Sequence, residues 1–138
     1  MIFQDKLIIA VDFDGTIVED AYPRVGKAKT FAFETLKRLQ KDGHRLILWT
    51  YRCGKTLDEA VAFCKENGIE FYAVNASFPE EVFDPAKSRK INADIFIDDR
   101  NVGGFYGWGE IYQLLSNNNQ SPLAEPKKKG LFSFLKGK

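Results

Sequence analysis

Short runs of apolar residues without polar alternation are the feature that most constrains the fold of this chain. The first run is Leu7 to Val11, and further candidate strands lie at 46–49, 71–74 and 94–97. Strands that are buried on both faces of a parallel sheet carry apolar side chains in succession, whereas half-buried strands alternate. The runs therefore predict a buried parallel sheet.

Amphipathic helices are predicted between these strands. Apolar residues recur near helical spacing in segments 29–41 and 57–67, and Gly43 and Gly68 end the two segments. A last short helix is predicted at 110–115. Strand, helix, strand, helix, strand is the order of an α/β protein with a doubly wound parallel sheet.

The length of 138 residues predicts one domain. We expect a core at 1–116 and a flexible basic tail at 117–138, where prolines follow an asparagine-rich stretch. From residue 116 onward five lysines and one glutamate give +4, which leaves −3 on the rest of a chain whose net charge is +1. This acidic body lacks the basic character of a nucleic-acid-binding protein.

Two cysteines, Cys53 and Cys64, are present. Without a recognisable secretory leader, free thiols in a reducing cytoplasm are the simplest interpretation. No apolar stretch approaches the roughly 20 residues needed to span a bilayer.

Reactive polar residues stand at the ends of three predicted strands. Asp12 and Asp14 follow the first strand, Thr50 and Arg52 follow the second, and Asp98 and Asp99 follow the fourth. Lys90 precedes the fourth strand. Ligands of open α/β sheets bind outside the carboxyl ends of the strands, so we expect these side chains to converge there.

Each of these features has a structural alternative when it is taken alone. Asp14-Gly15 is typical of a turn, Thr50 of a cap, and Lys90 of a surface charge. The joint pattern favours a functional site. Carboxylates at this density need a neutralising cation, and hard oxygen ligands suit Mg²⁺, which also binds phosphate oxygens.

The four segments together resemble the haloacid dehalogenase-like superfamily of hydrolases. The resemblance covers roughly residues 5–115 and rests on Asp12-Phe13-Asp14-Gly15-Thr16, Thr50, Lys90 and Asp98-Asp99. It implies a Rossmann-like core with strand order 4-1-2-3 and a possible short fifth strand. Lys87 is an alternative to Lys90 as the lysine of the third motif.

The resemblance also implies roles. Asp12 would be the nucleophile that forms an aspartyl-phosphate, and Asp14 would be the general acid and base. Asp12, Asp14, Asp98 and Asp99 would hold Mg²⁺, with Asp14 using its backbone carbonyl. Thr50, Lys90, Gly15 and Arg52 would bind phosphate.

No inserted cap domain fits in the sequence. Segment 17–29 has room only for a short hairpin, and 51–89 holds one helix, one strand and a proline-containing loop. An open site accepts large substrates or is covered by a neighbouring subunit, as in a homo-oligomer. Candidates for substrate contact are Tyr22, Arg24, Asn75, Tyr106 and Trp108.

The sequence therefore predicts a Mg²⁺-dependent phosphatase that acts on a phosphorylated small molecule, although a macromolecular substrate stays open. The alternatives are a phosphotransferase or phosphomutase, and a signalling module phosphorylated on aspartate. No catalytic role is expected for His44, Cys53 or Cys64.

Overall fold

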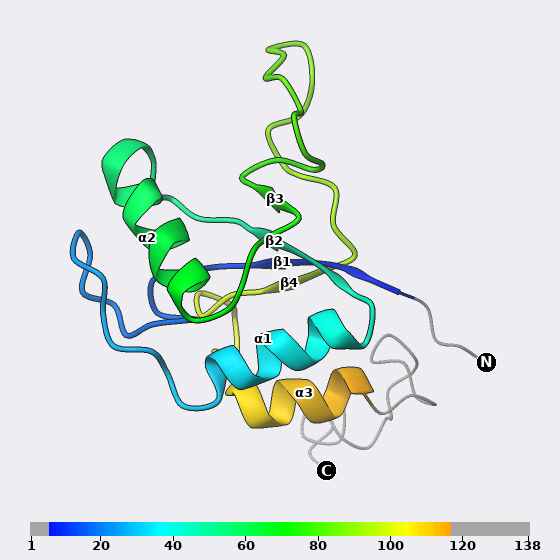
Figure 1. The fold of residues 1–138 in the computed structure, drawn as a ribbon. Coiled ribbons are helices and arrows are strands. Elements are labelled where there is room, and N and C mark those ends of the chain that lie inside the picture. The colour runs from blue at the N-terminus through cyan, green and yellow to red at the C-terminus, as the bar shows by residue number, and fades with distance from the viewer. Residues whose placement is uncertain (1–5, 117–138) are drawn as a thin grey trace.

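The computed structural model describes residues 6–116, and the tail at 117–138 lies outside them. Four strands and three helices make up this part of the chain (Figure 1). The elements are β1 (Ile8–Val11), α1 (Ala32–Lys41), β2 (Arg45–Leu48), α2 (Gly54–Glu66), β3 (Ala73–Val74), β4 (Ile95–Ile97) and α3 (Trp108–Ser116). The expected α/β class is confirmed, and only β3 is clearly shorter than its predicted strand.

The four strands form one parallel sheet in the order β3-β2-β1-β4. Read from the other edge, this is the expected order 4-1-2-3. Val11 pairs with Leu48 on one side and with Ile97 on the other. The residues that follow these three strands therefore emerge side by side. No fifth strand joins the sheet within residues 6–116.

The prediction of a doubly wound sheet is wrong for the described residues, because all three helices contribute to one core. Leu36, Cys64 and Trp108 bury their side chains in the same cluster as Ile9 and Leu48. The path β1-α1-β2-α2-β3 moves across the sheet in one direction, and right-handed crossovers place both helices on the same face. Only the return from β3 to β4 would cover the other face.

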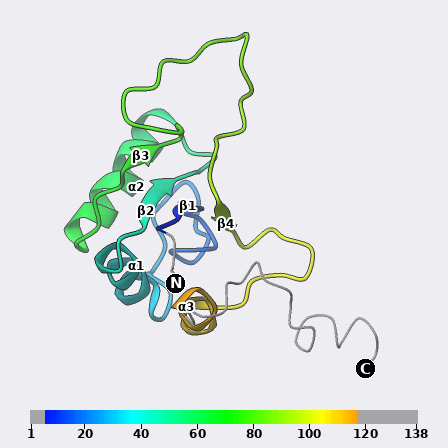
Figure 2. The ribbon, with the colours of Figure 1, turned by 90° about the vertical axis from the view of Figure 1, so that its right-hand side faces the viewer.

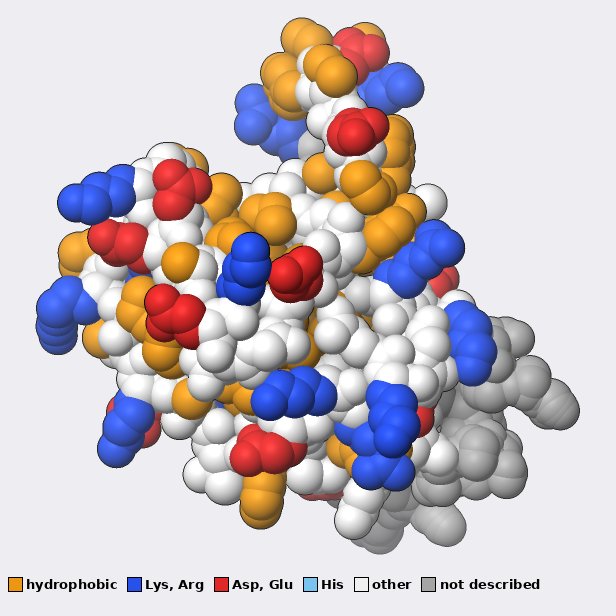
Figure 3. Space-filling view, viewed as in Figure 1, with side chains coloured by type: hydrophobic (Ala, Val, Ile, Leu, Met, Phe, Trp, Pro, Cys, Tyr) orange, Lys and Arg blue, Asp and Glu red, His pale blue; other side chains and the backbone are white. Residues whose placement is uncertain are grey.

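That return, residues 75–94, contains no helix. Ile91 and Ala93 cover part of the second face together with Ala10 and Ile47, but every residue from 78 to 90 is exposed. Figure 2 shows the segment as a long loop that rises away from the sheet. In the space-filling view it projects at the top of the molecule and carries apolar side chains outward (Figure 3).

The segment between β1 and α1 is a short hairpin-like flap, as predicted, and no cap domain stands in its place. Its two sides are joined by bonds from the Glu19 amide to the Lys27 carbonyl at 2.8 Å and from the Lys29 amide to the Ile17 carbonyl at 2.9 Å. Gly26 permits this approach, since a Cβ atom there would lie 1.9 Å from the Glu19 carbonyl oxygen. Within the described residues, no helix has the length and apolar character needed to cross a membrane.

Candidate active site

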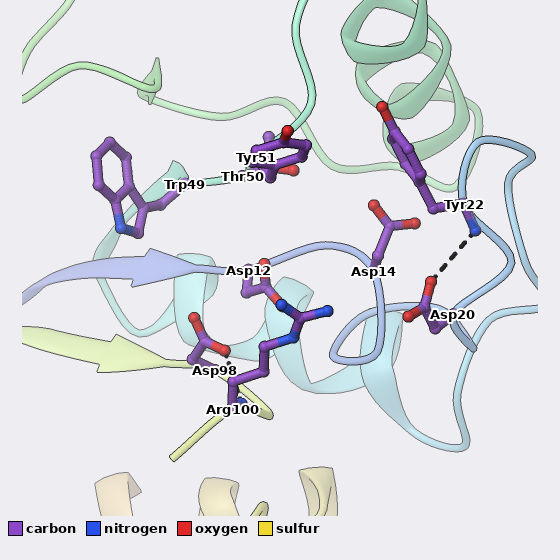
Figure 4. Close-up of a pocket in the computed structure, with 9 residues that line it drawn as sticks. All are labelled: Asp12, Asp14, Asp20, Tyr22, Trp49, Thr50, Tyr51, Asp98 and Arg100. Carbon is purple, nitrogen blue, oxygen red and sulfur yellow. Dashed lines mark hydrogen bonds between the residues drawn. The ribbon is translucent and has the colours of Figure 1, made fainter.

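A pocket of about 650 Å³ opens at the carboxyl ends of β1, β2 and β4 (Figure 4). The sequence places Asp12 directly after β1 and Asp98 directly after β4, and the parallel pairing brings the two together. The flap contributes one further side of the pocket. The lining residues are Asp12, Asp14, Asp20, Tyr22, Trp49, Thr50, Tyr51, Asp98 and Arg100.

Three carboxylates meet beside this pocket. Asp12, Asp98 and Asp99 each offer an oxygen atom, and these atoms all lie within 4.8 Å of one another. The buried Thr16 hydroxyl lies 2.8 Å from Asp12 Oδ2 and 3.1 Å from Asp99 Oδ1, and it donates to one of them at a time. Sequence reasoning gave Thr16 no role beyond its place in the motif.

The electrostatics of this group favour a bound cation. Burial, together with the neighbouring Asp99 and Asp98 and against the opposing hydrogen bond from Thr16, raises the pKa of Asp12 to about 7. Converging carboxylates of this kind suit a divalent ion. Mg²⁺ fits the donor set, because it prefers hard oxygen ligands and is usually held by one or two carboxylates plus substrate phosphates.

Gly15 shapes the site but does not offer its amide to a ligand. Its N–H donates to the Val18 carbonyl at 2.8 Å. The prediction that Gly15 binds phosphate through this amide is therefore wrong. Its φ is +87°, a conformation that glycine adopts readily. A Cβ atom there would lie 2.3 Å from Asp99 Oδ2. Glycine is therefore needed for Asp99 to reach the other carboxylates.

Asp14 does not join the three carboxylates, because Arg52 holds it. Arg52 Nε lies 2.7 Å from Asp14 Oδ2, and Nη2 lies 2.8 Å from Oδ1. The remaining guanidinium N–H groups donate to the carbonyls of Pro23, Arg24 and Thr56.

All five donors of Arg52 are thus engaged, and the residue is only 1% exposed. The predicted grip of Arg52 on phosphate is therefore wrong for this conformation. The side chain instead fixes Asp14 relative to the flap and to the start of α2.

Thr50 lies in the pocket as expected, and its hydroxyl proton is available. Its Oγ1 accepts the Arg52 amide at 3.1 Å, and its own amide donates to Asn75 Oδ1 at 2.8 Å. Asn75 also donates to the Arg52 carbonyl at 3.4 Å. Asn75 is therefore a support for residues 50–52, and it does not line the pocket.

Lys90 does not line the pocket. Its Nζ stands 5.3 Å from the centre of the Phe96 ring, and its residue belongs to the exposed loop. Lys87 is exposed in the same loop and does not line the pocket either. The cation in the pocket is Arg100, which the sequence reasoning missed. Its guanidinium forms no ion pair among the described residues.

The aromatic residues divide between pocket and core. Tyr22 lines the pocket as a substrate-contact candidate, whereas Arg24 does not. Trp49 and Tyr51 also line it, although sequence reasoning overlooked them. Trp108 is buried and donates from Nε1 to the Thr16 carbonyl at 2.8 Å, and Tyr106 lies outside the pocket.

Comparison with known proteins shows similarity to a solved structure. No protein-family model matches the chain, and no curated protein matches it. A solved structure of a conserved protein from Bacteroides thetaiotaomicron is similar with a TM-score of 0.78. The two are 56% identical over 82% of this chain and 92% of that one. The chain therefore belongs to the same family as this conserved Bacteroides protein.

Proposed function

We propose that the chain is a Mg²⁺-dependent phosphomonoester hydrolase related to the haloacid dehalogenase-like enzymes. The observation that carries the proposal is the convergence of Asp12, Asp98 and Asp99 at one sheet edge, with ligand atoms within 4.8 Å of one another. The Thr50 hydroxyl lines the same pocket. Carboxylates, a hydroxyl donor and a free cation in one cavity suit phosphoryl transfer.

Asp12 is the proposed nucleophile. Its carboxylate oxygen would attack phosphorus while the ester P–O bond breaks, and the departing alcohol oxygen would receive a proton from Asp14. Water would then attack the phosphorus of the aspartyl-phosphate and give its proton to Asp14. Inorganic phosphate would leave, and the Asp12 carboxylate would be restored.

The other residues would stabilise charge. Mg²⁺ held by Asp12, Asp98 and Asp99 would neutralise the negative charge that carboxylates and phosphate share. Thr50 would donate its hydroxyl proton to a phosphoryl oxygen, and Arg100 would pair with the same group in place of the lysine expected from sequence. The amides of Phe13 and Asp14, which have no acceptor among residues 6–116, would add further donors.

The proposal is tested by phosphate release from p-nitrophenyl phosphate, with Mg²⁺ and with a chelator. We expect turnover that requires Mg²⁺ and that falls on the order of 1,000-fold or more in Asp12→Asn, because the nucleophile is lost. Asp58→Asn is the matched control, since Asp58 is exposed on α2. Equal turnover by the parent and Asp12→Asn would refute the proposal.

A further inference from the structure

Three aromatic side chains surround the mouth of the pocket. Trp49 and Tyr51 flank Thr50 directly after β2, and Tyr22 reaches over the site from the flap (Figure 4). Tyr51 is 90% exposed and Tyr22 is 48% exposed. An exposed ring contributes little to the core, so folding alone does not explain two of these three side chains.

The half-exposed Tyr22 ring contacts two neighbouring side chains. Tyr22 and Tyr51 meet edge to face, with ring centres 6.2 Å apart. The guanidinium of Arg52 lies 5.2 Å from the centre of the Tyr22 ring. Arg52 is itself fixed by five hydrogen bonds, so it anchors Tyr22 from beneath. A ring that is already ordered loses little conformational entropy when a ligand stacks on it.

The size of the pocket indicates a ligand larger than phosphate. Ligand pockets commonly measure about 300–1,000 Å³, and this one measures about 650 Å³. The phosphate would occupy only the end beside Asp12 and Thr50. The lining of the remaining space includes the three aromatic side chains.

The charge of the pocket restricts which chemical group the substrate can carry beyond its phosphate. Four aspartates and one arginine line the cavity. Asp20 lies beside Tyr22, whose amide it accepts at 3.2 Å. A second acidic group on the substrate would meet this carboxylate at the mouth, and like charges repel. An uncharged planar ring meets no such penalty, and it stacks on tyrosine and tryptophan.

We propose that Trp49, Tyr51 and Tyr22 form a stacking subsite for a phosphate monoester that carries a planar aromatic ring and no second acidic group. This rests on the proposed phosphatase function and names its substrate class. Nucleoside monophosphates and phenolic phosphates share this chemistry. Phosphosugars lack the ring, and acidic phosphopeptides are disfavoured by Asp20.

The test compares two substrates that differ only in the base, adenosine 5′-monophosphate and ribose 5-phosphate. In the parent we expect kcat/KM to be at least about fivefold higher for the nucleotide, because base stacking on an aromatic side chain is a substantial interaction. Tyr51→Leu should lower that ratio, because Trp49 and Tyr22 would still be present, and Tyr51→Phe should keep it. Tyr106→Leu is the matched control, since Tyr106 is 59% exposed but lies outside the pocket.

A binding experiment tests this inference separately from the proposed function. Calorimetric titration of the Asp12→Asn protein with Mg²⁺ and either ligand requires no turnover. Tighter binding of the nucleotide, weakened in Asp12→Asn/Tyr51→Leu, supports the subsite even if no phosphate is released. Phosphate release from both esters with equal kcat/KM and equal affinity would overturn the subsite and leave the phosphatase proposal standing. Phenyl phosphate, run in the same variants, shows whether the ring stacks when it is attached directly to the phosphate.

Discussion

Arg52 is a charged residue with the burial of a core residue. Its guanidinium joins Asp14, the flap carbonyls of Pro23 and Arg24, and the Thr56 carbonyl of α2. Both Asp14 oxygens are fixed by the planar fork, which lysine cannot reproduce with a single ammonium. Arg52 is therefore a positioning residue for Asp14.

Arg52→Lys is predicted to impair proton transfer selectively. An alkyl phosphate needs a proton on its departing oxygen, so its kcat/KM, which reports the step that forms the aspartyl-phosphate, should fall by about 10- to 100-fold when Asp14 is misplaced. p-Nitrophenyl phosphate releases a stable anion without that proton, so its kcat/KM should fall by less than about threefold. Steady-state kinetics with both substrates check this prediction, and a thermal melt confirms folding. Equal losses with a raised KM would instead indicate that Arg52 binds phosphate.

The site residues show what sequence could and could not predict. Asp12, Asp98, Asp99 and Thr50 follow directly from parallel strands that end in polar residues, so their convergence was predictable. The contacts of Arg52 and Lys90 were not predictable, because they involve residues that are distant in the sequence. From its position in the sequence, Arg52 could bind either phosphate or a carboxylate. In the structure it forms hydrogen bonds with the Asp14 carboxylate. The position of Lys90 depends on the path of the loop at 78–90, all of whose residues are exposed.

At the scale of elements, His44 joins the starts of β1 and β2. Its Nδ1 accepts the Leu7 amide at 3.0 Å, and the Arg45 amide donates to the Leu7 carbonyl at 2.9 Å. Burial lowers the pKa of His44 below its ordinary value of 6.5, while Asp42 opposes and Lys6 supports that shift. Protonation of Nδ1 would remove the acceptor and break the link between the two strands.

The stability of the fold should therefore depend on His44 in a defined direction. A lowered pKa means that the stabilising contribution is complete above 6.5 and is lost as the pH falls through the folded-state value. His44→Asn retains an acceptor near Nδ1 and cannot titrate in this range. We expect the parent to lose more unfolding free energy than His44→Asn between pH 7 and pH 5, as measured by urea denaturation. If the unfolding free energies of the parent and of His44→Asn fell in parallel with pH, this role for His44 would be contradicted. The carboxylates titrate in both proteins, so their contribution cancels when the two are compared.

At the scale of the whole molecule, the described residues cover one face of the sheet with helices and the other without them, although Ala10 and Ile47 on that second face are buried. The elements and their order were predictable from apolar runs and glycine stops. The absence of a helix from the second face was not predictable, because it depends on the return from β3 to β4. That return crosses the sheet without the helix that a doubly wound fold requires, since Pro79 and Pro85 interrupt it. The helix-covered face thus contains the single cluster into which α1, α2 and α3 all pack.

Cys64 reports on the opening of this cluster. Its thiol is fully buried in α2, and burial raises its pKa to about 12, so the reactive thiolate is scarce in the folded state. Cys53 is exposed, and Cys53→Ser therefore leaves one protected thiol. We expect a thiol reagent to modify Cys64 only after the core opens.

Mg²⁺ should slow that modification if the carboxylate site binds it. A ligand that binds only the folded state stabilises it by about 2.7 kcal/mol at a concentration 100 times its Kd, which corresponds to a labelling rate about 100-fold lower. The measurement is the rate of Cys64 modification in the Cys53→Ser protein with and without Mg²⁺. Asp98→Asn should abolish the Mg²⁺ effect, and Asp58→Asn should retain it. A Mg²⁺-independent rate in the Cys53→Ser protein would contradict a metal site at the three carboxylates that is lost when the core opens, because an ion that binds only the folded state lowers the population of every opened state that lacks its site.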